Sequence, residues 1–171
     1  MHSISLDNKE LKSIHRFPLK LNTTLILSEL ERVLDRLTVL QYENQWCLQL
    51  PEGKTNPLYG AREGKYLDHT EDQFTEWVFD EMAYTRTVVE MLKLKRTRYM
   101  RNSPKSCMSY HQDPTKRIHI PLVTDPDCMM LVGDTVHHLE VGSYYLVDTT
   151  QKHSFLNMSK KCERIHLIGC V

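Results

Sequence analysis

The second half of the chain consists of short apolar runs interrupted at close intervals by turn signals, and this pattern restricts the fold more than any other feature. From about residue 98 onward, β-branched and apolar runs alternate with proline, glycine, aspartate and asparagine. The runs are SCMSYH, RIHIPLVT, CMMLVG, TVHHLEV, SYYLVD, HSFLN and RIHLIGCV. Such strands are typical of an antiparallel barrel or sandwich. Gly133 and Asp134 suit a tight hairpin turn between two of them.

The first half of the chain predicts helices instead. A helix is expected over 24–37, because its leucines recur at helical spacing beside a charged face. A second helix is expected over about 71–93, where apolar residues again recur at mainly helical spacing and Thr70 with Gln73 resembles a capping box. The basic run 93–101 predicts a helix end and then an edge strand with a solvated face. A role in holding an acidic substrate is the alternative.

Between these two helices the sequence predicts one strand and one long loop. The strand is expected near residues 46–50, and the segment 51–69 that follows contains prolines, glycines and polar residues at short intervals. Loops of this length in a compact domain are often functional lids or binding loops. An ordered surface excursion is an equally open interpretation.

Length and composition disfavour several classes of protein. With 171 residues, the chain is long enough for one domain with a core and short for two. Lys+Arg and Asp+Glu both number 22, so charge gives no support for binding nucleic acid or an anionic membrane. No run has the length of a membrane span, and the start lacks the apolar core of a signal peptide, so a cytoplasmic protein is expected. The five cysteines form no C-x-x-C pair and are expected to be reduced.

Three residues of the β half have the side chains of a metal site. His111 and Asp113 are two positions apart, so in a strand their imidazole and carboxylate lie on one face. His153, on or just before another strand, is the expected third ligand. Two imidazoles and one carboxylate form the facial triad characteristic of non-haem Fe(II) oxygenases. With nine histidines in the chain the pattern alone is a weak signal, and Asp113 before Pro114 is also a good turn opener.

Arg164 is a further unusual residue of this half. It lies in the apolar strand CERIHLIGCV, where a positive charge is costly unless it meets an anion. Its guanidinium could clamp a carboxylate through two parallel hydrogen bonds. A structural ion pair with Asp148 or Glu163 is the alternative.

Together these motifs resemble those of the Fe(II)/2-oxoglutarate-dependent oxygenases. The likeness rests on H-x-D, then RIHIPLVT, EVGSYYLVD, H-x-x-x-N and an arginine in the final strand. Within these oxygenases it points to the aspartyl/asparaginyl β-hydroxylase-like and proline 3-hydroxylase-like branch. It covers about residues 98–171 and implies a mainly β fold with N-terminal helices, a double-stranded β-helix (cupin-like jelly roll) with two supporting helices. We expect a single domain over 1–171, with 1–97 as helical support and long loop and 98–171 as the core that carries the metal site.

The resemblance also implies roles for individual residues. The two histidines and the aspartate of the triad bind Fe(II), and Arg164 holds the distal carboxylate of 2-oxoglutarate. Arg117, His119 and Asn157 match recurrent polar positions of the branch and are expected contacts for co-substrate or substrate carboxylates. A satisfied core histidine at His119 and a turn cap at Asn157 are the structural alternatives.

One alternative register concerns the first iron ligand. In the vertebrate-type aspartyl hydroxylases two histidines hold the metal without an acid, and the first of them lies in a stretch that resembles IHIPL. In that register His119 is the ligand, and position 121, where a carboxylate would otherwise fall, is proline. We prefer His111 and Asp113, because they complete a triad.

The implied function is hydroxylation of an unactivated C–H bond with Fe(II), 2-oxoglutarate and O2, releasing succinate and CO2. The expected substrate is an amino acid, free or within a peptide or protein, and Cys170 stands where nucleic-acid demethylases of the family carry a second arginine. Loops 51–69 and 102–106 are left to form the substrate surface. The alternatives are a non-catalytic cupin-like module that binds a metal or small acid, a metal-dependent isomerase and a dioxygenase that does not use 2-oxoglutarate.

Overall fold

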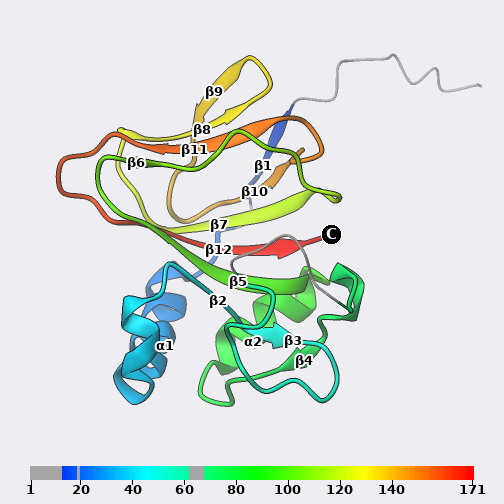
Figure 1. Cartoon of the computed structure of the whole chain (residues 1–171). Helices are drawn as coiled ribbons and strands as arrows, with labels where there is room; N and C mark the ends of the chain where they lie inside the picture. The colour runs from blue at the N-terminus through cyan, green and yellow to red at the C-terminus, as the bar shows by residue number, and fades with distance from the viewer. Residues whose placement is uncertain (1–12, 19, 62–67) are drawn as a thin grey trace, which may run out of the picture.

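The strands form two antiparallel sheets that face each other in the computed structural model, which describes residues 13–18, 20–61 and 68–171 (Figure 1). The larger sheet contains, in order, β1 (Ile14–Phe17), β10 (Tyr144–Val147), β7 (Arg117–Val123), β12 (Arg164–Cys170), β5 (Lys95–Asn102) and β2 (Gln45–Cys47). The smaller sheet contains β6 (Ser106–Cys107), β11 (His153–Asn157), β8 (Cys128–Val132) and β9 (Thr135–His138). A separate pair is formed by β3 (Gln49–Leu50) and β4 (Glu76–Trp77). This arrangement confirms the mainly β, cupin-like fold.

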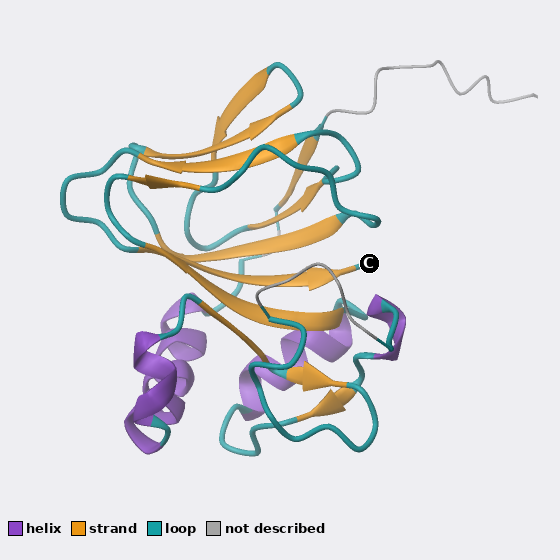
Figure 2. Ribbon diagram, in the orientation of Figure 1, coloured by secondary structure: helices purple, strands orange, loops and turns teal. Residues whose placement is uncertain are grey.

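The helices lie on the outer side of the larger sheet, away from the smaller one (Figure 2). They are α1 (Thr23–Arg36) and α2 (Ala83–Met91), with the short 3-10 helices η1 (Thr38–Tyr42) and η2 (Glu71–Gln73). The two supporting helices expected from the sequence are therefore present. None of the helices in the described ranges has the length and apolar character needed to cross a bilayer.

The central strand β7 shows how the larger sheet separates core from cavity. Ile118, Ile120 and Leu122 belong to the apolar cluster under the helices. Arg117 and His119 alternate with them and therefore project from the opposite face, toward the smaller sheet. The outer face of this sheet builds the hydrophobic core, and the inner face is left for polar side chains.

Two local predictions are confirmed. The helix expected over 24–37 is α1, whose first turn is capped by Asn22: its side-chain oxygen accepts a hydrogen bond from the Leu25 N–H at 3.0 Å. The expected hairpin turn joins β8 to β9, and Gly133 adopts a positive φ of 55° there. Asp134 completes this two-residue turn.

The single helix predicted over about 71–93 is wrong in its first half. The predicted capping box is present, but it caps only the short turn η2. After that turn β4 pairs with β3, and the N–H of Val78 donates to the carbonyl of Leu48 at 3.0 Å, so the backbone is committed to sheet pairing. Helix α2 begins only at Ala83. The apolar residues of this segment are spaced as in a helix because they are buried, as Phe79 is. A segment can bury such residues without being helical.

The basic run 93–101 also differs from its prediction. It forms most of β5, which lies between β12 and β2 and so is an inner strand rather than an edge strand. Arg96 and Arg98 are only 1% and 9% exposed. A buried cation needs a partner, so groups inside the protein or in its cavity have to interact with these two arginines.

Strands from the first half of the chain join the larger sheet. β1, which the sequence pattern did not indicate, pairs with β10, and β2 pairs with β5. The expected division between residues 97 and 98 falls within β5. A single domain over 1–171 stays a prediction.

The loop predicted over 51–69 is irregular in its described part. The N–H of Cys47 in β2 donates to the carbonyl of Pro57 at 2.7 Å, and Ala61 is fully buried. The loop up to Ala61 is thus anchored against the larger sheet. Residues 62–67 of this prediction lie outside the described residues.

Helix α2 is capped by a glutamate from the other helix. No side chain of its own caps its N-terminus. Instead the buried carboxylate of Glu29 in α1 accepts hydrogen bonds from the N–H groups of Tyr84 and Thr85 at 2.9 and 2.8 Å and from the Thr85 hydroxyl at 2.7 Å. A negative charge at a helix N-terminus is favourable. This contact explains why α2 begins where it does and fixes it to α1.

Replacing Glu29 with alanine should lower the free energy of unfolding by roughly 2 kcal/mol, because three donors lose their acceptor. Urea denaturation followed by circular dichroism measures this change. The matched control is Glu31→Ala on the exposed face of the same helix, which should cost less than about 0.5 kcal/mol. Equal losses in the two variants would contradict the capping role.

Candidate functional site

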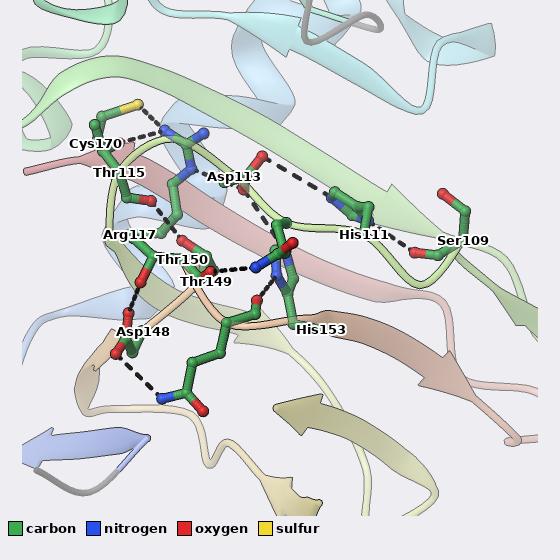
Figure 3. Close-up of polar contacts among 12 residues, drawn as sticks. Ser109, His111, Asp113, Thr115, Arg117, Asp148, Thr149, Thr150, His153 and Cys170 are labelled. Atoms are coloured by element: carbon green, nitrogen blue, oxygen red, sulfur yellow. Dashed lines mark hydrogen bonds and ion pairs between the residues drawn. The ribbon is translucent and has the colours of Figure 1, made fainter. Parts of the chain in front are cut away.

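Two histidines and an aspartate meet at one end of the barrel (Figure 3). The Nε2 atoms of His153 and His111 lie 3.6 and 3.9 Å from the two carboxylate oxygens of Asp113. All three potential ligand atoms lie within 4.8 Å of one another. The structure therefore brings together the three residues that the sequence singled out.

Backbone pairing places these residues. His111 is not in a continuous strand; it forms an isolated antiparallel bridge with His153, with N–H to carbonyl distances of 3.1 and 2.8 Å. The N–H of Asp113 donates to the carbonyl of Thr149 at 2.8 Å. Asp113 lies just beyond the bridge, and the convergence comes from this short pairing rather than from a regular strand.

The ring nitrogens are oriented by carbonyl groups. Nδ1 of His111 lies 2.7 Å from the carbonyl oxygen of Ser109, and Nδ1 of His153 lies 3.0 Å from that of Gln151. A carbonyl only accepts, so Nδ1 carries the proton and Nε2 keeps its lone pair toward Asp113. Burial lowers the pKa of His153, which favours the neutral imidazole. Neutral imidazole is the form that binds metals.

A cavity of about 320 Å³ opens at this cluster. His153 is 2% exposed in its side chain, whereas His111 and Asp113 are 35% and 22% exposed. The walls beyond the cluster include Arg98 and Phe155, as well as side chains from the inner face of β7. A small molecule could therefore approach the cluster from solvent and be enclosed by the barrel.

Arg117 is committed to carboxylates of the protein itself. Its Nε lies 3.1 Å from Asp113 Oδ2, and its Nη2 lies 2.6 Å from Glu71 Oε1. The remaining Nη1 contacts the Thr115 hydroxyl at 3.2 Å and the thiol of Cys170. Arg117 thus holds the aspartate of the cluster in position (Figure 3), and the contact with co-substrate or substrate expected for it stays a prediction.

Glu71 is the buried counter-charge that sequence analysis missed. It also pairs with Arg96 at 2.9 Å, so one carboxylate serves two buried guanidinium groups. Burial by itself would raise the pKa of Glu71, but the hydrogen bond and charge of Arg117, with smaller contributions from Thr115 and Arg96, hold it at about 2. The sequence placed this residue in the first turn of a helix, where a glutamate is common and gives no signal.

Arg164 is fully buried deeper in the barrel. Its guanidinium donates to the side-chain oxygen of Asn102 at 3.3 Å, lies 2.9 Å from Nδ1 of His166, and packs 4.0 Å from the centre of the Phe155 ring. Burial lowers its pKa to about 9. Phe155 lines the cavity, and Arg164 lies against that ring.

No carboxylate pairs with Arg164 among the residues that the structure describes. Glu163, one suggested partner, lies 3.4 Å from Arg101 instead. Asp148, the other, accepts hydrogen bonds from Thr150 and Gln151. Burying a positive charge without a carboxylate partner is costly.

Two buried histidines adjoin this cation. The His119 ring centre lies 5.3 Å from that of Phe155 and 5.8 Å from that of His166. Both ring nitrogens of His119 and Nε2 of His166 find no hydrogen-bond partner in the described part of the chain. Buried polar atoms normally have partners, so the two nitrogens of His119, which lines the cavity, favour a polar ligand there. His166 was not singled out, although it shares a strand face with Arg164 by its i, i+2 spacing.

Asn157 does not reach the cluster. It ends β11 at the opposite end from His153. Its amide nitrogen donates to the carbonyls of Asn102 and Cys162 at 3.0 and 2.9 Å, and its side-chain oxygen accepts from the N–H of Ser159 at 3.1 Å. These bonds shape the turn after β11, as its structural alternative expected.

The donor set at the cluster fits a divalent transition metal. Two imidazoles and a carboxylate provide three ligands, and the adjoining cavity leaves space for exogenous ones. This is the pattern of a facial triad with open positions. His119 is not part of this ligand group.

Comparisons with known proteins give a family and two similar folds. The family model described as Aspartyl/Asparaginyl beta-hydroxylase matches residues 21–170. HygX from Streptomyces hygroscopicus, in a structure with nickel and 2-oxoglutarate bound, is 9% identical with a TM-score of 0.54 over 91% of this chain and 80% of that one. AviO1 from Streptomyces viridochromogenes Tue57 is 14% identical with a TM-score of 0.51 over 92% and 89%. No curated protein sequence matches the chain.

The buried Glu71 predicts a specific pH dependence of stability. Its pKa rises from about 2 in the folded protein to the ordinary 4.5 on unfolding, so its contribution is complete above pH 4.5 and is lost as the pH falls toward 2. The stability difference between wild type and Glu71→Gln should therefore shrink by roughly 3 kcal/mol over that range. Urea denaturation at a series of pH values measures it.

The exposed Glu52→Gln is the matched control for this experiment. It should follow the pH dependence of the wild type. A stability difference between wild type and Glu71→Gln that is the same at pH 3 and pH 7 would contradict the role of Glu71 as the shared counter-charge.

Proposed function

The chain belongs to the aspartyl/asparaginyl β-hydroxylase family, and from this premise we propose that it hydroxylates an unactivated C–H bond of an amino acid, free or within a peptide or protein. It is an enzyme of the dioxygenase class, with Fe(II) as its metal and 2-oxoglutarate and O2 as co-substrates. Family membership favours this function over a non-catalytic cupin-like module. The convergence of His111, Asp113 and His153 beside an open cavity is the observation that carries the proposal.

The three convergent residues would hold the iron. When bound, Fe(II) supplies O2 activation and C–H oxidation, coupled to conversion of 2-oxoglutarate into succinate and CO2. The carbonyl acceptors at Nδ1 select, for each neutral imidazole, the tautomer whose Nε2 is free to bind a metal, and Arg117 orients the carboxylate of Asp113. Such outer contacts fix ligand orientation.

A 2-oxoglutarate site is supported by the buried cation and the unpartnered histidine nitrogens. Arg164 would hold the distal carboxylate, and His119 would donate to the co-substrate from the cavity wall. HygX, which has a similar fold, holds nickel and 2-oxoglutarate. The Phe155 ring, which lines the cavity, packs on the guanidinium of Arg164, so the distal carboxylate would approach Arg164 past this ring.

The prime substrate is proposed to carry a carboxylate. Arg98 lines the cavity, and its Nε has no hydrogen-bond partner among the described residues. The side-chain hydrogen bond that Arg98 makes within the described ranges runs from Nη1 to the carbonyl of Ala61 at 3.4 Å. An amino acid or acidic peptide supplies the anion that this buried cation lacks. Ala61 belongs to the loop expected to form the substrate surface.

Two variants decide which histidine binds iron. Asp113→Ala should weaken Fe(II) binding at least roughly tenfold, because it removes one of three ligands. His119→Ala should leave Fe(II) affinity within about twofold but reduce turnover, because His119 contacts co-substrate. Anaerobic calorimetric titration with Fe(II) measures both. Loss of iron binding in His119→Ala with none in Asp113→Ala would favour the alternative register.

Variants of two arginines distinguish the proposed co-substrate site from the proposed substrate site. Arg164→Met should raise the KM for 2-oxoglutarate by roughly 30-fold or more, since it removes a buried charge partner. Arg98→Met should leave that KM unchanged and raise the KM of the prime substrate. Succinate release, first screened over amino acids and acidic peptides, measures both, with circular dichroism as the check on folding. An unchanged KM for 2-oxoglutarate in Arg164→Met would overturn the assignment of its site.

A further inference from the structure

A second group of metal-binding side chains lies at the other end of the barrel. Asp125 follows β7, Cys128 begins β8, and Cys162 lies in the connection from β11 to β12. Their potential ligand atoms all lie within 4.8 Å of one another. Cys128 pairs with Asn157 at the end of β11, whereas the iron site is at His153, where that strand begins.

Hydrogen bonds hold the two loops of this group in register. The Ser159 hydroxyl donates to Asp125 Oδ2 at 2.7 Å and accepts from the N–H of Cys162 at 2.9 Å. The thiol of Cys128 lies 3.4 Å from the side-chain oxygen of Asn157. Ser159 thus links the carboxylate of Asp125 to the backbone of Cys162. Hydrogen bonds of this kind orient metal ligands.

The three side chains differ in exposure in a way that permits entry of an ion. Cys128 is buried, while Asp125 and Cys162 are partly exposed. Both cysteines are free thiols in the structure.

We propose that Asp125, Cys128 and Cys162 form a second metal site, which takes a thiophilic divalent cation such as Zn²⁺. Two thiolates and one carboxylate suit Zn²⁺ better than Mg²⁺ or Ca²⁺, which prefer oxygen ligands alone. The side-chain oxygen of Asn157, already beside Cys128, or a water completes four-fold coordination. A bound ion would fasten the connection after β7 to the connection after β11. This site does not depend on the iron site or on the proposed substrate.

Cadmium is the probe, because a cadmium–thiolate bond gives an ultraviolet charge-transfer band that histidine and carboxylate ligands do not give. The reduced, metal-free protein should bind one Cd²⁺ with this band and show a raised melting temperature. Cys128→Ser and Cys162→Ser should each lose the band and weaken Cd²⁺ binding at this site at least roughly tenfold.

Two variants serve as controls, and a third is a further test. Cys107→Ser, which removes the exposed thiol outside the group, should keep the band. His111→Ala, at the iron site, should also keep it. Asp125→Asn keeps both thiols and the shape of the side chain, and should weaken Cd²⁺ binding without loss of folding, so the test survives if Cys128→Ser does not fold.

Three outcomes would overturn the proposal. The first is no thiolate band in the reduced protein even with Cd²⁺ in excess. The second is a band that persists in both Cys128→Ser and Cys162→Ser. The third is a disulfide between these two cysteines, found by mass spectrometry without reductant, in a protein whose reduced form takes up no metal at the thiols.

Discussion

Strand alternation in the larger sheet is the constraint on which the rest of the structure depends. Because neighbouring side chains point to opposite faces, one strand can supply both the core and the site. In β7, Ile118 and Ile120 pack under the helices while Arg117 and His119 face the smaller sheet. The hydrophobic core under the helices and the polar wall of the cavity are therefore two consequences of the same alternation, one on each face of the sheet.

The balance of buried positive and negative charges determines which ligands the inner face of the larger sheet favours. Arg96 and Arg117 share the buried carboxylate of Glu71, and Arg117 in turn holds Asp113. Arg98 and Arg164 have no such carboxylate within the described ranges. Burying an unpaired charge is costly, which supports our proposal that anions from outside complete this interior. A dicarboxylate co-substrate and a carboxylate-bearing substrate have the required chemistry.

The sequence was sufficient where the signal is local and failed where tertiary structure overrides it. The His111, Asp113 and His153 cluster could be anticipated, because two members are neighbours and the third begins a recognisable strand. Glu71 could not, since its partners come from β5 and β7 and a glutamate in a presumed helix carries no signal. The prediction of one helix over 71–93 failed for the same reason. Apolar spacing predicts burial, whereas the pairing between β3 and β4 determines the backbone conformation.

The most direct test of the account is a crystal structure grown without oxygen in the presence of Fe(II) and 2-oxoglutarate, with anomalous data collected at the iron edge. The account predicts one strong iron peak between His111, Asp113 and His153, with the distal carboxylate of 2-oxoglutarate against Arg164. An iron peak at His119 without Asp113, or a co-substrate carboxylate held away from Arg164, would contradict it.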